Sequence, residues 1–146
     1  MLSVRDLVRL VLVLFRNAGF HSVTRMHVIK ACYLIEREYF KERKQRLTDL
    51  YYYNYLYGPF NMWIVNVLEE MTDRGVIGRG EDEYTYDISD LHYLNDDRLM
   101  KIVGKPILDK VMRIIRKYPY AFDLADYIHR LPEVRNTPFG EPIRFK

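Results

Sequence analysis

The side chains in this chain that could do chemistry are four histidines, one cysteine and a group of carboxylates. The histidines are His21, His27, His92 and His129. Zinc sites place their ligands at characteristic short spacings, such as His-Glu-x-x-His, and these four histidines show no such spacing. Cys32 lies in an apolar helical stretch, which favours a buried structural thiol over a nucleophile. We therefore expect no metal site and no cofactor.

The carboxylates are concentrated in the middle of the chain, at Glu69, Glu70, Asp73, Glu81, Asp82 and Glu83. Acid–base catalysis would require them to lie in a partly apolar cleft that shifts their pKa values. Here they fall on the polar face of a predicted helix and in a turn, which is typical of a solvated surface. Asp126 and His129 are three residues apart, so they could form a hydrogen-bonded pair on a helix. These patterns predict a protein that is not an enzyme.

The most informative stretch is Tyr-Tyr-Tyr-Asn-Tyr-Leu-Tyr-Gly-Pro, residues 51–59. Its odd-numbered tyrosines alternate, so a β-strand would place them on one face; they are Tyr51, Tyr53, Tyr55 and Tyr57. The other face would carry Tyr52, Asn54 and Leu56. Such a strand is either buried on both sides or presents an aromatic face to a partner, and the sequence leaves both alternatives open.

The composition is that of an ordinary globular protein, since 49% of the 146 residues are hydrophobic and 29% are charged. A single cysteine excludes an internal disulfide framework and fits a reducing compartment. The apolar run Val8–Phe15 is interrupted by Arg9 and is too short to span a bilayer. It also lacks a following cleavage site for a signal peptide, so we expect a cytoplasmic protein.

Helical periodicity and capping residues predict most of the elements. Ser3 caps a helix that ends at Asn17–Gly19, and Thr24 caps a central, well-buried helix from Arg25 to Phe40. The tyrosine strand follows, and Gly58 and Pro59 stand where the cap and first residue of a third helix would lie. That helix is expected to run to about Arg74.

A two-stranded ribbon is predicted next, from a short strand at Val76–Ile77 and a returning strand at Tyr84–Ile88. A helical pattern begins near Asp96, and further helices follow at Pro106–Tyr118 and Ala121–Leu131. The expected fold is α+β and mostly helical, with five or six helices, a small antiparallel sheet and a winged-helix-like β-ribbon. We expect one globular domain over residues 1–135 and a wrapped or mobile C-terminal extension over 136–146.

A winged helix commonly binds DNA, and the distribution of charge tests that function. Residues 51–100 carry three basic and ten acidic side chains, and the predicted helix before the ribbon contains Glu69, Glu70 and Asp73. This surface would repel phosphates. A basic stripe on a later helix is the better candidate for nucleic acid, formed by Lys110, Arg113, Arg116 and Lys117. The same pattern is typical of the solvated face of an amphipathic helix, and we favour that interpretation.

Three short motifs resemble one known family. Lys30-Ala-Cys-Tyr33-Leu is similar to its Lys-x-x-Tyr-Leu stretch, Tyr57-Gly58-Pro59 to its Tyr-Gly-Pro signature, and the segment ending at His129 to its C-terminal helix. In order and spacing they resemble the Panacea, or SocA-like, antitoxin domain over residues 4 to about 135. The resemblance implies an antitoxin or proteolytic adaptor that binds a partner protein such as a toxin directly.

Our leading hypothesis is a non-catalytic, regulatory interaction module that contacts a partner protein through Tyr51, Tyr53, Tyr55, Tyr57, Gly58 and Pro59. Tyrosine is enriched among residues that dominate binding energy, and this chain has 13 of them. The alternative is a winged-helix-like, DNA-binding transcriptional regulator. A homodimer is compatible with both hypotheses.

Overall fold

The computed structural model describes residues 1–91 and 97–145, and within them the chain forms seven helices and five short strands. The helices are α1 (Val4–Asn17), α2 (Arg25–Arg43), α3 (Met62–Asp73), α4 (Asp97–Val103), α5 (Lys105–Lys117), α6 (Ala121–His129) and α7 (Pro132–Arg135). The strands are β1 (Ser22–Thr24), β2 (Tyr53–Tyr55), β3 (Gly58–Phe60), β4 (Gly78–Arg79) and β5 (Thr85–Asp87). The predicted α+β, mostly helical fold is confirmed. His92 and the expected helix start at Asp96 lie outside the described residues.

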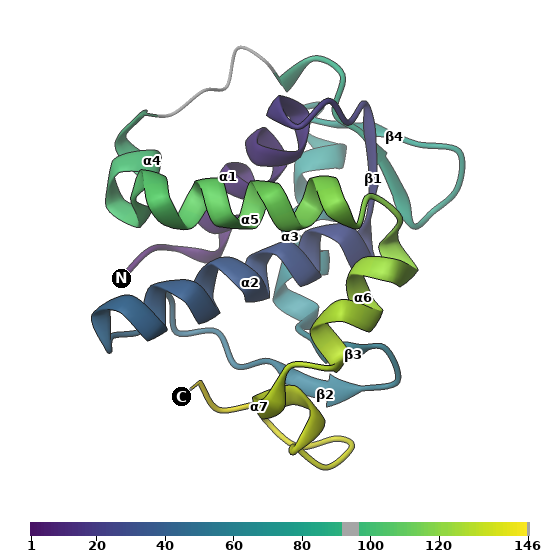
Figure 1. Cartoon of the computed structure of the whole chain (residues 1–146). Helices are drawn as coiled ribbons and strands as arrows, with labels where there is room; N and C mark the ends of the chain where they lie inside the picture. Colours follow the sequence, from purple (N-terminus) through teal and green to yellow (C-terminus); the bar gives the residue numbers. More distant parts are fainter. Residues whose placement is uncertain (92–96, 146) are drawn as a thin grey trace.

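Helix α2 is the centre of the molecule (Figure 1). It lies between α1 and α5 on one side and the β2–β3 hairpin on the other, and α3 and α6 also pack against it. Its N-cap is the predicted one, since the Thr24 side chain accepts a hydrogen bond from the backbone N–H of His27, but the helix continues past Phe40 to Arg43. The His27 side chain in turn accepts one from the Thr24 backbone, which satisfies two otherwise unpaired donors. Helix α2 is buried over most of its length, and α1, α3, α5, α6, β1 and β3 all pack against it.

The β-ribbon is part of a three-stranded antiparallel sheet with the order β1-β5-β4. The expected ribbon after α3 is present, but its first strand is Gly78–Arg79 rather than Val76–Ile77. The N–H groups of Val76 and Ile77 donate to Met71 O near the end of α3, so strand pairing begins only after these two residues. Strand β1 was not predicted, because three residues are too few to show the alternation of apolar and polar side chains that indicates a strand. The order α1, β1, α2, α3, β4, β5 is that of a winged helix, with the β2–β3 hairpin inserted between α2 and α3.

The segment after the tyrosine run differs from the prediction. Gly58 and Pro59 do not open α3 but belong to β3, which pairs antiparallel with β2 in a tight hairpin. Helix α3 begins at Met62, and Asn61 is its cap, accepting a hydrogen bond from the N–H of Trp63 at 2.8 Å. Gly58 has a φ of +92°, so its role is to turn the hairpin, which a side chain would strain.

The C-terminal segment lies along the outer edge of β2. The N–H of Asn54 donates to Glu141 O at 2.9 Å, and the N–H of Ile143 donates to Tyr52 O at 2.7 Å. Ile143 is buried, and the ring of Phe145 lies 5.4 Å from that of Tyr33. These contacts occupy the hydrogen-bonding edge that β2 would otherwise expose.

None of the helices in the described ranges has both the length and the apolar composition that crossing a bilayer requires.

Candidate protein-binding surface

The alternation of the tyrosine run places its odd-numbered tyrosines outside and Tyr52 and Asn54 inside. Leu56, which was expected on the inner face, lies in the hairpin turn and is exposed. Tyr51 is 58% exposed and Tyr55 is 41% exposed, whereas Tyr52 between them is only 1% exposed. Asn54 also points inward, where its amide donates to Thr137 O at 2.7 Å. The choice that the sequence left open is therefore decided by the structure in favour of an exposed aromatic face.

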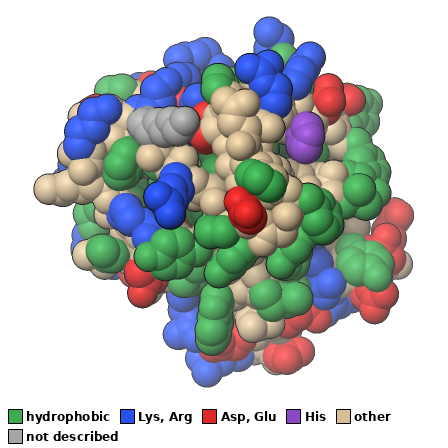
Figure 2. Space-filling model, turned by 90° about the horizontal axis from the view of Figure 1, so that it is seen from below, with side chains coloured by type: hydrophobic (Ala, Val, Ile, Leu, Met, Phe, Trp, Pro, Cys, Tyr) green, Lys and Arg blue, Asp and Glu red, His purple; other side chains and the backbone are tan. Residues whose placement is uncertain are grey.

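Other elements extend this surface, which we call the aromatic face. Its members are Tyr51, Tyr53, Tyr55, Leu56, Tyr57, Met62, Trp63, Tyr84, Phe122 and Phe139, all large hydrophobic side chains that are exposed. They come from the hairpin, the start of α3, the ribbon, α6 and the C-terminal segment. Figure 2 views the molecule from the hairpin side and shows hydrophobic side chains gathered across the middle of this face. Large exposed apolar patches are common at interaction sites of soluble proteins.

Two hollows of similar size divide the aromatic face. The Trp63 groove has a volume of about 650 Å³ and is lined by Val4, Asp49, Leu50, Tyr51, Tyr53, Tyr55, Phe60, Asn61, Met62 and Trp63. The Lys30 groove has a volume of about 690 Å³ and is lined by Thr24, Arg25, Met26, Ile29, Lys30, Tyr55, Leu56, Tyr57, Gly58, Phe60, Met62, Val65, Tyr84, Ala121 and Phe122. The two grooves share a ridge formed by Tyr55, Phe60 and Met62.

Lys30 contributes a buried amine to the second groove. It is only 3% exposed, and its Nζ donates to Pro59 O at 2.6 Å. Burial lowers the pKa of this amine to about 7, because the apolar surroundings disfavour its charged form. The bond to Pro59 also ties the hairpin to α2. Burying a cation inside the fold costs free energy of folding. The position of Lys30 at an apolar groove is therefore a reason to look for a role in binding.

The residues of the family motifs meet around Gly58. A Cβ added at Gly58 would lie 3.9 Å from the Nζ of Lys30 and 3.8 Å from the Nδ1 of His129. His129 thus lies beside the hairpin, while Asp126, its predicted partner, forms an ion pair with Arg130 at 3.7 Å. The bond to Arg130 is possible because Arg130 follows Asp126 by four residues, which is the better helical spacing for a long side chain.

Replacing Gly58 by Ala is expected to destabilise the protein by about 1 kcal/mol, because a residue with a Cβ is strained at positive φ. The neighbouring atoms at 3.8 Å and beyond leave room for the methyl group, so the loss should reflect backbone strain alone. Urea unfolding measures it. Gly75→Ala, at a positive φ in open space outside both grooves, is the matched control and should show a similar loss.

Tyr33 belongs to a buried polar cluster one turn further along α2. Its hydroxyl donates to Glu133 Oε1 at 3.0 Å, and Arg37 Nε donates to the same carboxylate. Burial opposes ionisation of Glu133, but the hydrogen bond from Arg37 helps to outweigh it and holds the pKa of this carboxyl below its usual value. The cluster joins α2 to α7 and gives Tyr33 a structural role behind the hairpin.

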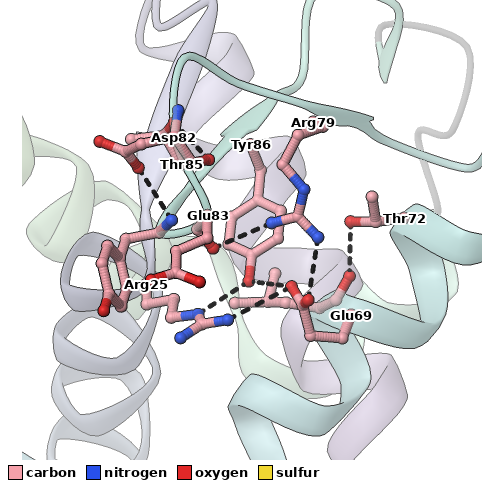
Figure 3. Close-up of polar contacts among 10 residues, drawn as sticks. Arg25, Glu69, Thr72, Arg79, Asp82, Glu83, Thr85 and Tyr86 are labelled. Carbon is pink, nitrogen blue, oxygen red and sulfur yellow. Dashed lines mark hydrogen bonds and ion pairs between the residues drawn. The ribbon is translucent and has the colours of Figure 1, made fainter.

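The sequence predicted that the acidic side chains of α3 are simply solvated. In the structure, Glu69 is instead part of a network of hydrogen bonds. Glu69 accepts hydrogen bonds from Arg79 Nη2 at 2.9 Å and from the Tyr86 hydroxyl at 2.6 Å (Figure 3). Arg25 donates to the same hydroxyl at 3.0 Å and lies over the ring of Tyr84 at 5.1 Å. The hydrogen bond from Arg79 is the largest cause of the lowered pKa of Glu69. This network holds the ribbon on α3 and positions Tyr84 at the groove.

The basic stripe on α5 is partly neutralised. Lys110 Nζ lies 2.9 Å from Glu38 Oε1, whereas Arg113 and Arg116 are exposed. The Nζ of Lys117 lies 5.6 Å from the centre of the Tyr118 ring. Three of the four cations therefore remain at the surface with their charge largely available.

The other chemistry-bearing residues have structural surroundings. His27 is buried, its Nε2 lies 2.9 Å from Pro119 O, and burial lowers its pKa. Cys32 is fully buried, and burial raises the pKa of its thiol, which disfavours the reactive thiolate. Among the residues that the structure describes, no three His, Cys, Asp or Glu side chains are grouped as metal ligands would be.

Sequence reasoning missed part of the aromatic face. The predicted helix from Pro59 gave no sign that Met62 and Trp63 are exposed, whereas in the structure both lie in the first turn of α3 and face outward. Phe122 and Phe139 are more than sixty residues from the hairpin, yet their rings lie 5.5 Å from Tyr57 and 5.8 Å from Tyr55. No local pattern could indicate these two contacts.

Comparison with known proteins agrees with the motif resemblance. The profile of the antitoxin SocA-like, Panacea domain matches residues 28–133, a span that begins within α2, includes the hairpin and the ribbon and ends within α7. The searches of curated proteins and of solved structures found no match. Since the profile covers well over half of the 146 residues, the chain belongs to the antitoxin SocA-like, Panacea domain family.

Proposed function

We propose that this protein is a non-catalytic regulatory module, antitoxin- or adaptor-like, that binds a partner protein through the aromatic face. The observation that carries the proposal is a set of exposed aromatic side chains around the β2–β3 hairpin, within a domain of an antitoxin family. Such residues supply large contact area at a small cost in conformational entropy. The proposal includes a cytoplasmic location and a toxin as the class of partner.

The mode of binding follows from the edges of the hairpin. The C-terminal segment covers the outer edge of β2, and Pro59 O in β3 is already bound to Lys30. A partner that adds a strand would have to displace these contacts. We therefore propose that the partner inserts side chains into the two grooves rather than extending the sheet.

Affinity capture from the source cells tests this function. Tyr55→Ala and Trp63→Ala should each weaken binding to the captured protein about thirtyfold, as expected for central aromatic residues of an interface. Tyr120→Ala is the matched control, because Tyr120 is an exposed aromatic residue that lines neither groove. Isothermal titration calorimetry gives the affinities. A protein that captures nothing, or whose affinity is unchanged in both face variants, would contradict the proposal.

DNA binding is the second candidate, favoured by the winged-helix order of the elements. It would use the exposed cations Arg113, Arg116 and Lys117 rather than α3, whose Glu69 and Glu70 are bound to arginines. A gel shift with random duplex at low salt distinguishes it. Binding that weakens steeply with salt and with Arg113→Ala would support it, and a micromolar protein that shifts no DNA would eliminate it.

A further inference from the structure

The Lys30 groove has a chemical character that narrows the class of partner. Its walls are formed largely by Met26, Ile29, Leu56, Phe60, Val65 and Phe122. Among the described residues that line it, the two formally charged side chains are both basic, Arg25 and Lys30, and none is an aspartate or a glutamate. The groove therefore suits an apolar segment that also carries a negative charge.

Arg25 and Lys30 differ in what they can offer a ligand. The Arg25 guanidinium is already engaged by the Tyr86 hydroxyl, by Glu69 and by the ring of Tyr84. Lys30 donates to Pro59 O, the one acceptor that the described residues provide for it. A lysine ammonium has three N–H donors, so the remaining donors can bind an acceptor that enters the groove. Lys30 is thus a buried cation whose hydrogen-bonding capacity is incompletely used.

We infer that the Lys30 groove binds an apolar segment of the partner protein, and that an aspartate or glutamate carboxylate in that segment pairs with Lys30. This inference rests on the proposed function. The apolar side chains of that segment fill the space between the hairpin, α2 and α6. The carboxylate then completes the hydrogen bonding of the amine in surroundings that exclude water, where a charge-assisted bond is strong. The hydrogen bond to Pro59 O uses one N–H of the protonated amine, so the other two N–H groups can donate to a carboxylate in the groove.

The same geometry predicts how the amine responds to the ligand. Without a ligand, burial holds the pKa of Lys30 at about 7, and a neighbouring carboxylate must raise it, because an opposite charge favours the protonated form. The other titratable groups around Lys30 are Arg25, Tyr55, Tyr57 and Tyr84 in the groove lining, and His129, which approaches Gly58 from α6. The shift must therefore be followed at Lys30 itself.

The test on the isolated protein uses phenylbutyrate and its neutral twin, phenylbutyramide, as probes. NMR of the wild type should show that phenylbutyrate shifts the methyl signals of Ile29 and Val65 and raises the pKa of Lys30. Its affinity should exceed that of the amide by about tenfold, and Lys30→Met should abolish the difference. Lys101→Met, which removes an exposed lysine of α4, should leave it unchanged. Equal binding of acid and amide, or shifts outside the groove, would overturn the inference.

The second test of this inference uses the partner protein captured from the source cells. Lys30→Met should weaken its binding at least about tenfold, and amidation of one acidic residue of the partner should reproduce the loss without adding to it. If Tyr55→Ala weakens binding while Lys30→Met does not, the proposed function stands and this inference fails. If phenylbutyrate binds at Lys30 but no acidic residue of the partner matters, the groove takes small acids and the inference is likewise wrong.

Discussion

Replacing Lys30 by Met is expected to stabilise the protein at pH 7. The buried amine has a pKa of about 7, against an ordinary lysine value of 10.5. Between these values the unfolded chain holds a proton that the folded chain lacks, so the free energy of unfolding rises with pH across this window. This difference in pKa lowers the free energy of unfolding of the wild type at pH 7 by an amount on the order of 4 kcal/mol. Methionine removes it but leaves Pro59 O without its donor, which costs about 2 kcal/mol.

The net expectation is a variant more stable by about 2 kcal/mol at pH 7, with a difference that shrinks and then reverses as pH approaches 10. Urea unfolding of both proteins at a series of pH values measures it, and subtracting the two curves cancels the titration of all other groups. Lys101→Met serves as the control and should shift stability little at any pH, since Lys101 is exposed. A difference independent of pH would show that Lys30 titrates normally.

The second large effect is expected at the buried cluster behind the hairpin. Arg37→Leu should destabilise the protein by about 3 kcal/mol, because it leaves the buried carboxylate of Glu133 without its cation. Loss of Arg37 should also raise the pKa of Glu133, so that the variant becomes more stable relative to wild type as pH falls and the carboxyl is protonated. Thermal unfolding across the acidic range follows both effects.

A double-mutant cycle separates the ion pair from simple packing. Adding Glu133→Gln to Arg37→Leu should recover part of the loss, since the amide carries no charge that needs a partner. Tyr33 can still donate its hydroxyl proton to the amide oxygen, which preserves the third member of the cluster. Additive effects of the two substitutions would mean that Arg37 and Glu133 are not coupled. Arg113→Leu, on the exposed face of α5, is a control expected to change little.

These two predictions have opposite signs for a physical reason. Arg37 is matched by a carboxylate inside the fold, so removing it exposes an unpaired charge. Lys30 has only a neutral carbonyl, so removing it relieves a cost. A cost in stability of this kind is what we expect at a residue retained for binding, the role proposed above for Lys30.

Much of the helical framework could be predicted because its signals are local. Ser3 and Thr24 satisfy backbone donors within three residues of themselves, and the apolar period of α1 and α5 repeats within each helix. The ribbon after α3 and the motif resemblance also came from neighbouring residues. The start of α3 did not: Pro59 is equally suited to a helix start and to a strand edge, and only pairing with Asn54 selects the strand.

By itself, the sequence determined the mostly helical α+β fold, the family and the presence of an unusual aromatic run. The tertiary structure alone decided that the odd-numbered tyrosines are exposed, since the alternation of a strand does not say which face meets the core. It also brought Lys30, Gly58 and His129 together from three distant segments and placed Phe122 and Phe139 beside the hairpin. Such long-range contacts arise from the packing of α6 and the C-terminal segment on α2 and β2, which no local period encodes.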